Sequence, residues 1–149
     1  MGADLYITPL YEQQQKEWQP RFEKAAEQRD SLPSGSREYH QAQAEVERCF
    51  GKMRQVGYFR DPYNDNDLLW KFGLSWWGDV IPMLDKKGRL SVGQTQKLLD
   101  LVSEKENAFA LNLAKLPSAE RRYQRRRYRL LQRFLRQAIE LDTPIDTWL

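Results

Sequence analysis

The chain has 149 residues, a formal net charge of +3, and 40% hydrophobic residues that include five tryptophans. This length fits one domain, and this apolar content excludes an intrinsically disordered chain. Cys49 has no second cysteine with which to form a disulfide, and no stretch approaches the roughly 20 apolar residues that a membrane span requires. Because the N-terminus also lacks a signal-peptide pattern, we expect one helical domain over residues 1–149 in the cytoplasm.

The first 31 residues predict a short extended segment and one helix. Ala3 to Ile7 alternates small or polar residues with apolar ones, which favours an extended segment. A helix is expected from Leu10 to about Ser31, with Pro20 either kinking it or starting a new helix. Its expected apolar face comprises Tyr11, Trp18, Phe22, Ala25 and Ala26.

The second helix follows a cluster of helix-breaking residues, Ser31 to Gly35. Ser36 is placed to cap this helix by accepting backbone N–H bonds, and Gly57 fits a left-handed C-terminal cap. Apolar residues recur at three- and four-residue steps, as in a buried helix face. They are Tyr39, Ala42, Val46, Cys49, Phe50 and Met53.

The middle of the chain predicts an ordered loop and two short helices that form the central core. Residues 58–67 combine aromatic with turn-forming residues, and Asn64 to Asp67 offer caps for a helix from Leu68 to Phe72. Ser75 can cap the next helix, Trp76 to Leu84. The expected core residues are Leu68, Leu69, Trp70, Phe72, Leu74, Trp76, Trp77, Val80 and Ile81.

The last third predicts a helix starting at Ser91, whose spacing to Gln94 fits a capping box, and a long final helix capped by Ser118 and ending near Leu141. The end of the first of these helices is open, since Leu111, Leu113 and Leu116 can continue it past Asn107. The tail from Ile145 to Leu149 is expected to be tied down. The fold class predicted is therefore mainly all-α, a compact bundle of five to six helices.

Arginines dominate one side of the final helix. Residues 117–136 hold eight arginines against the single Glu120, so the remainder of the chain is net negative. At about 100° per residue, one face carries apolar residues and the opposite quadrant carries arginines alone. The predicted core face is Tyr123, Leu130, Leu131, Phe134, Leu135, Ala138 and Leu141. The predicted exposed arginine stripe is Arg122, Arg125, Arg126, Arg129, Arg133 and Arg136.

This arginine stripe has several interpretations. A solvated helix face is one, but surfaces built for solubility mix both signs, and like charges at i,i+4 repel. Either carboxylates of the same chain, such as those of the first two helices, or a partner offsets the repulsion. Guanidinium groups bind carboxylates and phosphates alike, so both an acidic protein and a nucleic-acid backbone remain candidates. We favour the acidic protein, since the net-negative remainder weakens contact with a polyanion.

Catalytic and metal-binding patterns are weak. His40 and Cys49 lie nine residues apart on one helix and face opposite ways, which disfavours a Cys–His pair. The run from Asp61 to Asp67 supplies oxygen ligands but lacks the glycine and glutamate of a calcium loop. A looser Mg²⁺ or Ca²⁺ site of a metal-dependent enzyme is the alternative. Its ligands would be Asp61, Asp65 or Asp67, with Asp79 or Asp85.

Two segments carry a resemblance. GADLYI at the start and YFRDPYNDNDLLWKFGLSWW in the middle resemble a group of small bacterial and phage-encoded proteins to which we attach no activity. The resemblance implies a shared helical fold and assigns no functional residue. By analogy, small proteins of this kind act by binding host or defence machinery.

These observations together predict a non-enzymatic binding, adaptor or inhibitor protein that engages a macromolecule through the arginine stripe. No cofactor and no membrane partner are expected. The alternatives are a nucleic-acid backbone binder, a metal-dependent enzyme built on residues 61–67, and a self-associating structural subunit.

Overall fold

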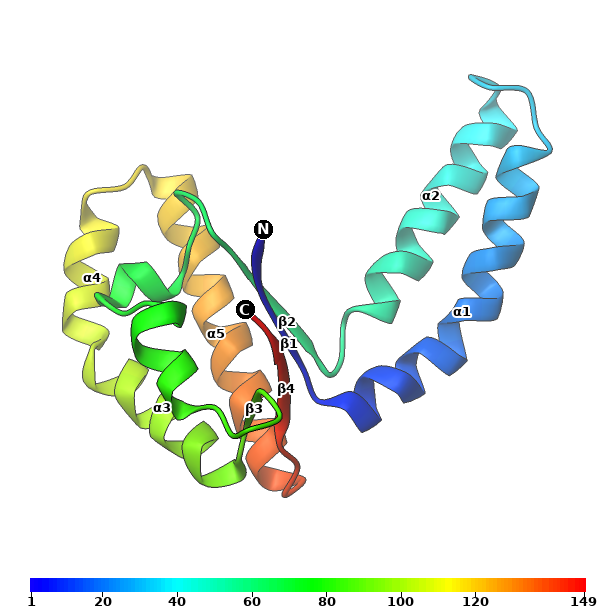
Figure 1. The fold of residues 1–149 in the computed structure, drawn as a ribbon. Coiled ribbons are helices and arrows are strands. Elements are labelled where there is room, and N and C mark those ends of the chain that lie inside the picture. Colours follow the sequence, from blue (N-terminus) through cyan, green and yellow to red (C-terminus); the bar gives the residue numbers. More distant parts are fainter. The chain divides into compact units, whose positions relative to one another are not determined.

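The structure, a computed structural model, describes all residues from Met1 to Leu149. The chain forms two compact units: Met1–Ile7 with Phe59–Leu149, and Thr8–Tyr58 between them. Helices make up most of both units (Figure 1), so the mainly helical character is confirmed. The single domain stays a prediction. No helix combines the length and the apolar character that crossing a bilayer requires.

A four-stranded sheet joins the two ends of the chain. Its strands are β1 (Gly2–Tyr6), β2 (Tyr58–Pro62), β3 (Arg89–Leu90) and β4 (Ile145–Trp148), in the order β2-β1-β4-β3. The central pair, β1 and β4, is antiparallel, with Leu5 opposite Thr147. Only β1 was predicted as extended. The expected tethering of the tail is confirmed, since β4 pairs with strands on both sides.

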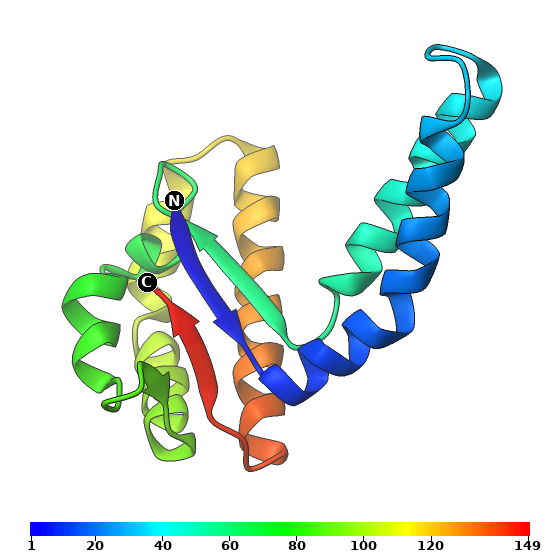
Figure 2. The same ribbon diagram turned by 45° about the vertical axis from the view of Figure 1, so that its right-hand side comes forward.

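Three helices lie on one face of this sheet (Figure 2): α3 (Val92–Glu104), α4 (Glu106–Ala114) and α5 (Ser118–Glu140). Leu5 and Ile145 from the sheet and Leu98 and Leu131 from the helices are completely buried in this unit. The burial of apolar side chains between the two layers supplies the main stabilisation of this unit. The predicted bundle therefore lacked the sheet: this unit is a layer of helices packed on a four-stranded sheet.

The caps of the last three helices are confirmed in part. The hydroxyl of Ser91 accepts the N–H of Gln94, as predicted. The chain breaks at Lys105, so α3 and α4 are separate helices, and the end that the sequence left open lies at Glu104. Helix α5 begins at Ser118 itself and has no side-chain cap, which corrects the role predicted for that serine.

The segment between β2 and β3 contains three short helical turns. They are η1 (Leu69–Phe72), η2 (Trp76–Val80) and η3 (Ile81–Met83), of 3₁₀, π and 3₁₀ type. Two predicted signals are confirmed: Asp67 Oδ1 accepts the N–H of Trp70, and Ser75 Oγ accepts the N–H of Gly78. Gly73, which follows η1, is left-handed.

Two residues of the predicted central core lie outside it. Trp70 is 66% exposed and Trp77 is 61% exposed, whereas Leu69, Phe72 and Trp76 are buried. In a turn of about three residues, Leu69 and Phe72 share one side and Trp70 falls on the other. The core was predicted from the high apolar content of this segment, which does not tell which side of such a short turn is buried.

The second unit is a helical hairpin of α1 (Thr8–Asp30) and α2 (Arg37–Met53) (Figure 1). Helix α1 continues through Pro20. Ser36 caps α2 by accepting the N–H of Tyr39, as predicted. Gly57 is left-handed, at φ 71°, but it lies beyond the end of α2 and does not cap it.

The two helices of the hairpin are buried to different extents. Helix α2 buries Ala42, Val46, Cys49 and Met53. Helix α1 fully buries Ala25 alone, and the other residues of its predicted apolar face are partly buried. Tyr11, Trp18, Phe22 and Ala26 are each partly exposed. A two-helix unit has one contact face, and long side chains at its margins stay in contact with water.

A buried ion pair links α5 to β2. The carboxylate of Asp61 is completely buried and accepts four hydrogen bonds. Its Oδ1 accepts the N–H of Leu68 at 2.7 Å and Nη2 of Arg127 at 2.8 Å. Its Oδ2 accepts the N–H of Leu69 at 3.0 Å and the indole N–H of Trp76 at 2.8 Å. The negative charge therefore has partners on every side.

Arg127 extends this network to the backbone. Its Nη2 also donates to the carbonyl of Arg60 at 2.7 Å, and its Nη1 donates to the carbonyl of Asn66 at 2.8 Å. The neighbouring Gln124 donates to the same carbonyl of Asn66 at 3.1 Å. Two residues of α5 thus hold the chain on both sides of Asp61.

Replacing Asp61 with alanine should destabilise the protein by about 3–5 kcal/mol, because Arg127 would keep its buried charge without a counterion. Chemical denaturation of the purified proteins measures this difference. Asp85→Ala is the control in the same unit, since its ion pair with Arg89 is partly exposed and its loss should cost much less. Equal costs for the two variants would show that the buried pair has no special role.

Candidate interaction surface

Helix α5 is continuous over 23 residues and has one strongly buried side. Its buried residues recur at three- and four-residue steps, which places them on a single face against α3, α4 and the sheet. They are Gln124, Arg127, Tyr128, Leu131, Phe134, Leu135 and Ala138. A helix fixed along one face by this burial holds the residues of its opposite face in a defined row.

All six arginines of the predicted arginine stripe are exposed: Arg122, Arg125, Arg126, Arg129, Arg133 and Arg136. The other two arginines of the run have structural roles. Arg127 pairs with Asp61 in the interior, and Arg121 donates to the carbonyl of Leu116 at 3.1 Å, near the end of α4. The stripe therefore consists of the six arginines of this run that are not bonded to other parts of the unit.

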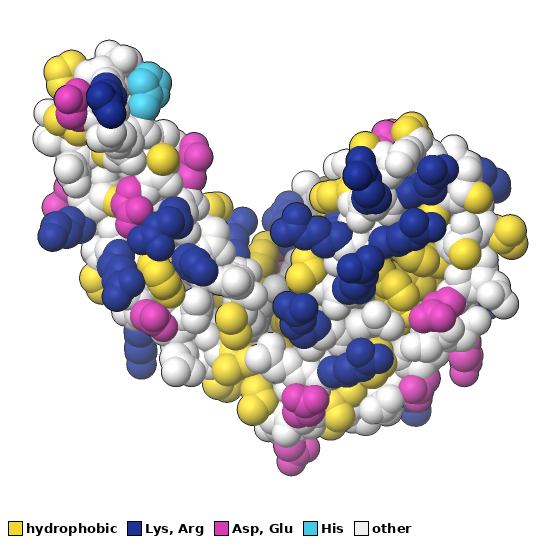
Figure 3. Space-filling model, turned by 180° about the vertical axis from the view of Figure 1, so that it is seen from behind, with side chains coloured by type: hydrophobic (Ala, Val, Ile, Leu, Met, Phe, Trp, Pro, Cys, Tyr) yellow, Lys and Arg dark blue, Asp and Glu magenta, His cyan; other side chains and the backbone are white.

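The six stripe guanidinium groups have no ion pair or hydrogen bond within their own unit. The ion pairs of that unit join Arg60 to Asp4, Arg89 to Asp85 and Arg127 to Asp61. The paired carboxylates of α1 and α2, Asp30 and Glu45, bind Arg29 and Arg48 of the hairpin. On the surface drawn in Figure 3, basic side chains gather over α5 and acidic ones lie toward the lower edge of that unit. The stripe is a same-sign surface.

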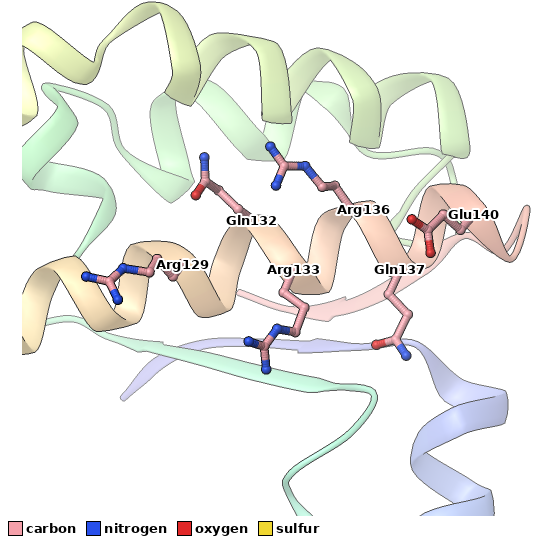
Figure 4. A pocket seen from close by; sticks show the side chains of 6 residues that line it. All are labelled: Arg129, Gln132, Arg133, Arg136, Gln137 and Glu140. Atoms are coloured by element: carbon pink, nitrogen blue, oxygen red, sulfur yellow. The ribbon is translucent and has the colours of Figure 1, made fainter.

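The C-terminal half of the stripe borders a shallow hollow of about 390 Å³. Its lining residues are Arg129, Gln132, Arg133, Arg136, Gln137 and Glu140. Gln132 and Arg136 extend to one side of α5 and Arg133 and Gln137 to the other, with Glu140 at the far end (Figure 4). Three guanidinium and two amide groups present N–H donors here, a set suited to carboxylate or phosphate oxygens.

An apolar margin flanks the stripe. Tyr123, Leu130 and Leu141 were predicted on the core face but are 49%, 42% and 49% exposed. The centre of the buried face runs through Gln124 and Leu131, and these three residues lie roughly 80–100° from it. They therefore form the border between the core and the arginines.

Sequence reasoning missed the polar residues of the buried face, Gln124 and Arg127. A positional signal existed, because Gln124, Leu131 and Ala138 are spaced by seven residues and lie along one line of the helix. Because glutamine and arginine are polar, the sequence did not predict that these two side chains are buried. Their hydrogen-bond partners, Asp61 for Arg127 and the carbonyl of Asn66 for Gln124, lie about 60 residues earlier in the chain.

The residues of the alternative metal site have other roles. Both oxygens of Asp61 accept hydrogen bonds in the interior, while Asp65 is exposed. Oδ1 of Asp67 accepts the N–H of Trp70 in η1. No three acidic, histidine or cysteine side chains are grouped as metal ligands. In place of cation ligands, Asp61 and Asp67 are acceptors of protein N–H groups.

His40 and Cys49 do not approach each other. His40 is exposed, whereas Cys49 is completely buried and its thiol lies 3.6 Å from Oε1 of Glu45. Burial raises the pKa of the Cys49 thiol, and the neighbouring Glu45 raises it further. The predicted reading of Cys49 as a buried thiol is confirmed.

Comparison of the chain with protein-family models, with curated proteins and with solved structures finds no match. The resemblance of its two segments to small bacterial and phage-encoded proteins stays a prediction. The candidate surface therefore has to be argued from its own chemistry.

Replacing Arg129 with glutamate should stabilise the isolated protein by about 1 kcal/mol, because the repulsion with Arg125 and Arg133 at i−4 and i+4 becomes attraction. Arg129→Gln removes the repulsion without adding attraction and should give a smaller gain. Chemical denaturation at low salt measures both, and the gains should shrink in high salt. A loss of stability in both variants would show that the stripe contributes to folding.

Asp67 should make stability depend on pH. Burial, and secondarily the charge of Asp61, raise the pKa of Asp67 to about 6. A carboxyl group whose pKa is higher in the folded state favours folding when protonated, so its contribution is lost as pH rises from about 4 to 6. Asp67→Asn keeps an acceptor for the N–H of Trp70 and cannot titrate. The stability of this variant relative to wild type should rise between pH 4.5 and 7.5 in denaturation experiments; a constant difference would refute the shift.

Proposed function

We propose that this chain is a non-enzymatic binding protein whose α5 arginine stripe engages an acidic surface of another protein. The observation that carries the proposal is the row of six exposed guanidinium groups on one continuous helix, none of which has a counterion within its unit. A partner that supplies carboxylates would offset the repulsion among them.

The dimensions and chemistry of the stripe support a protein interface. At about 1.5 Å per residue, Arg122 and Arg136 lie roughly 21 Å apart along the helix, a length suited to a patch of standard interface size. Arginine is enriched in interfaces because its planar group forms paired hydrogen bonds with carboxylates. A helix face provides these groups with little rearrangement on binding.

Two features favour an acidic protein over a nucleic-acid backbone. The remainder of the chain, outside residues 117–136, is net negative and would weaken extended contact with a polyanion. The exposed margin of Tyr123, Leu130 and Leu141 offers apolar contact beside the charges. Protein interfaces combine such apolar contact with a charged rim, whereas phosphate contacts are mainly electrostatic.

The test compares two variants of equal charge. The stripe variant changes Arg125, Arg126, Arg129 and Arg133 to glutamate. The control changes four exposed lysines of the same unit to glutamate: Lys86, Lys87, Lys97 and Lys115. Each protein is used for affinity purification from nuclease-treated lysate of its native host, and mass spectrometry identifies what is retained. Circular dichroism establishes that both variants keep their helices.

The expected result is a partner retained by wild type and by the lysine variant but lost by the stripe variant. With the purified partner, the stripe variant should bind at least about 100-fold more weakly, as reversing several interface charges requires. Retention of every partner by the stripe variant would overturn the proposal. Retention of duplex or single-stranded nucleic acid by wild type in filter binding, weakening tenfold or more with added salt, would replace it with the backbone-binding function.

A further inference from the structure

The unit that carries the arginine stripe has a second surface, which bears acidic and aromatic side chains in place of arginines. A groove of about 550 Å³ lies between the loop after β2 and the turns η1 and η2. Its lining residues are Tyr63, Asn64, Asp65, Asp67, Trp70, Lys71, Ser75 and Trp77. None of these residues belongs to the arginine stripe. Its volume falls within the range of small-molecule and side-chain pockets.

Aromatic rings form much of this groove. Trp70 and Trp77 are 66% and 61% exposed, although Trp76 between them in sequence is buried. The ring of Tyr63 lies beside that of Trp77, with centroids 6.3 Å apart. The hydroxyl oxygen of Tyr63 is buried and has no partner in hydrogen-bond geometry. Two exposed indoles beside a buried phenol are typical of a binding surface, since they leave apolar area in contact with water.

The groove is also electrically negative, in contrast to the net positive charge of the chain. Asp65 and Asp67 contribute carboxylates, while Lys71 directs its ammonium group to the backbone carbonyl of Asp65 at 3.1 Å. The pKa of Tyr63 is raised by burial and then by the charges of Asp67, Asp61 and Asp4. The smaller, charge-dependent part of this shift reflects the carboxylates that lie near the phenol.

We propose that this groove binds an organic cation, a guanidinium or alkylammonium group, between the indole rings of Trp70 and Trp77 and the carboxylates of Asp65 and Asp67. The faces of indole rings attract cations, and the attraction increases as water is excluded. The carboxylates add direct charge complementarity. A phosphate-bearing ligand would meet these two carboxylates at close range, and a neutral ligand would cover them without a counterion.

The experiment follows the indole ¹H–¹⁵N signals of the full chain by NMR during titration with two cations. The probes are N-acetyl-arginine amide and choline. Their uncharged counterparts, N-acetyl-citrulline amide and 3,3-dimethylbutanol, have nearly the same shape. Saturable shifts of Trp70 and Trp77 with both or either cation, and none with its uncharged counterpart, are expected. A preference for the arginine probe identifies a protein side chain as the ligand, and a preference for choline identifies a quaternary ammonium compound.

The variants test the residues separately. Trp70→Ala and Trp77→Ala should each weaken binding by about 3- to 30-fold, the range that one cation–π contact implies. Asp65→Asn, at an exposed position without a side-chain hydrogen bond, should weaken it as well. Trp148→Ala, at an exposed tryptophan outside the groove, should bind as wild type does. An unchanged signal for the buried Trp76 shows that each variant is folded.

Three results would overturn this proposal. One is the absence of any shift at 100 mM of either cation, and another is equal binding of the charged and uncharged probes. The third is an equal loss of affinity in Trp148→Ala, which would indicate non-specific contact. None of these results bears on the arginine stripe, because the probes are cations and the stripe is left unchanged.

Discussion

The buried pair of Asp61 and Arg127 determines what both surfaces present. With Arg127 directed into the interior, the rotation of α5 about its axis is fixed, and the six stripe arginines must point away from the core. On the other side, Asp61 holds the N–H groups of Leu68 and Leu69 and the indole of Trp76. With Trp76 held inside, its neighbour Trp77 lies outside, in the groove. One carboxylate thus positions the helix and the loop.

Neither the arginine stripe nor the groove is expected of a sequence optimised for stability alone. Apolar residues can often replace a buried ion pair without loss of stability. The pair of Asp61 and Arg127 is therefore better explained by the defined arrangement that it imposes than by the stability that it adds. A row of arginines at i,i+3 and i,i+4 spacing destabilises the helix that carries it. Exposed indoles leave apolar area in water. Features that oppose stability are expected where a protein binds something else.

Sequence reasoning succeeded where the local pattern is regular. The three- and four-residue periodicity of α2 and α5 and the caps at Ser36, Ser75 and Ser91 follow from short-range physics, and they placed the six arginines outside. Reasoning failed where the outcome depends on distant residues. Arg127 is buried because Asp61 lies 66 positions earlier, and β3 has two residues, too few for a pattern. Trp70 and Trp77 were misplaced because the apolar content of the segment does not show which side of a 3₁₀ or π turn is buried.

The arginine stripe and the groove are complementary in charge, so the stripe of one molecule could in principle bind the groove of a second copy of the chain. The groove holds two carboxylates within one cavity and can neutralise one or two guanidinium groups. The stripe extends roughly 21 Å, so a groove of a second molecule would leave most of its arginines without counterions. Such a contact is also heterologous, joining unlike surfaces, and does not close into a symmetric dimer. Matching the stripe would require carboxylates spread along about four helical turns, which is why the proposed partner is a different protein with an acidic face.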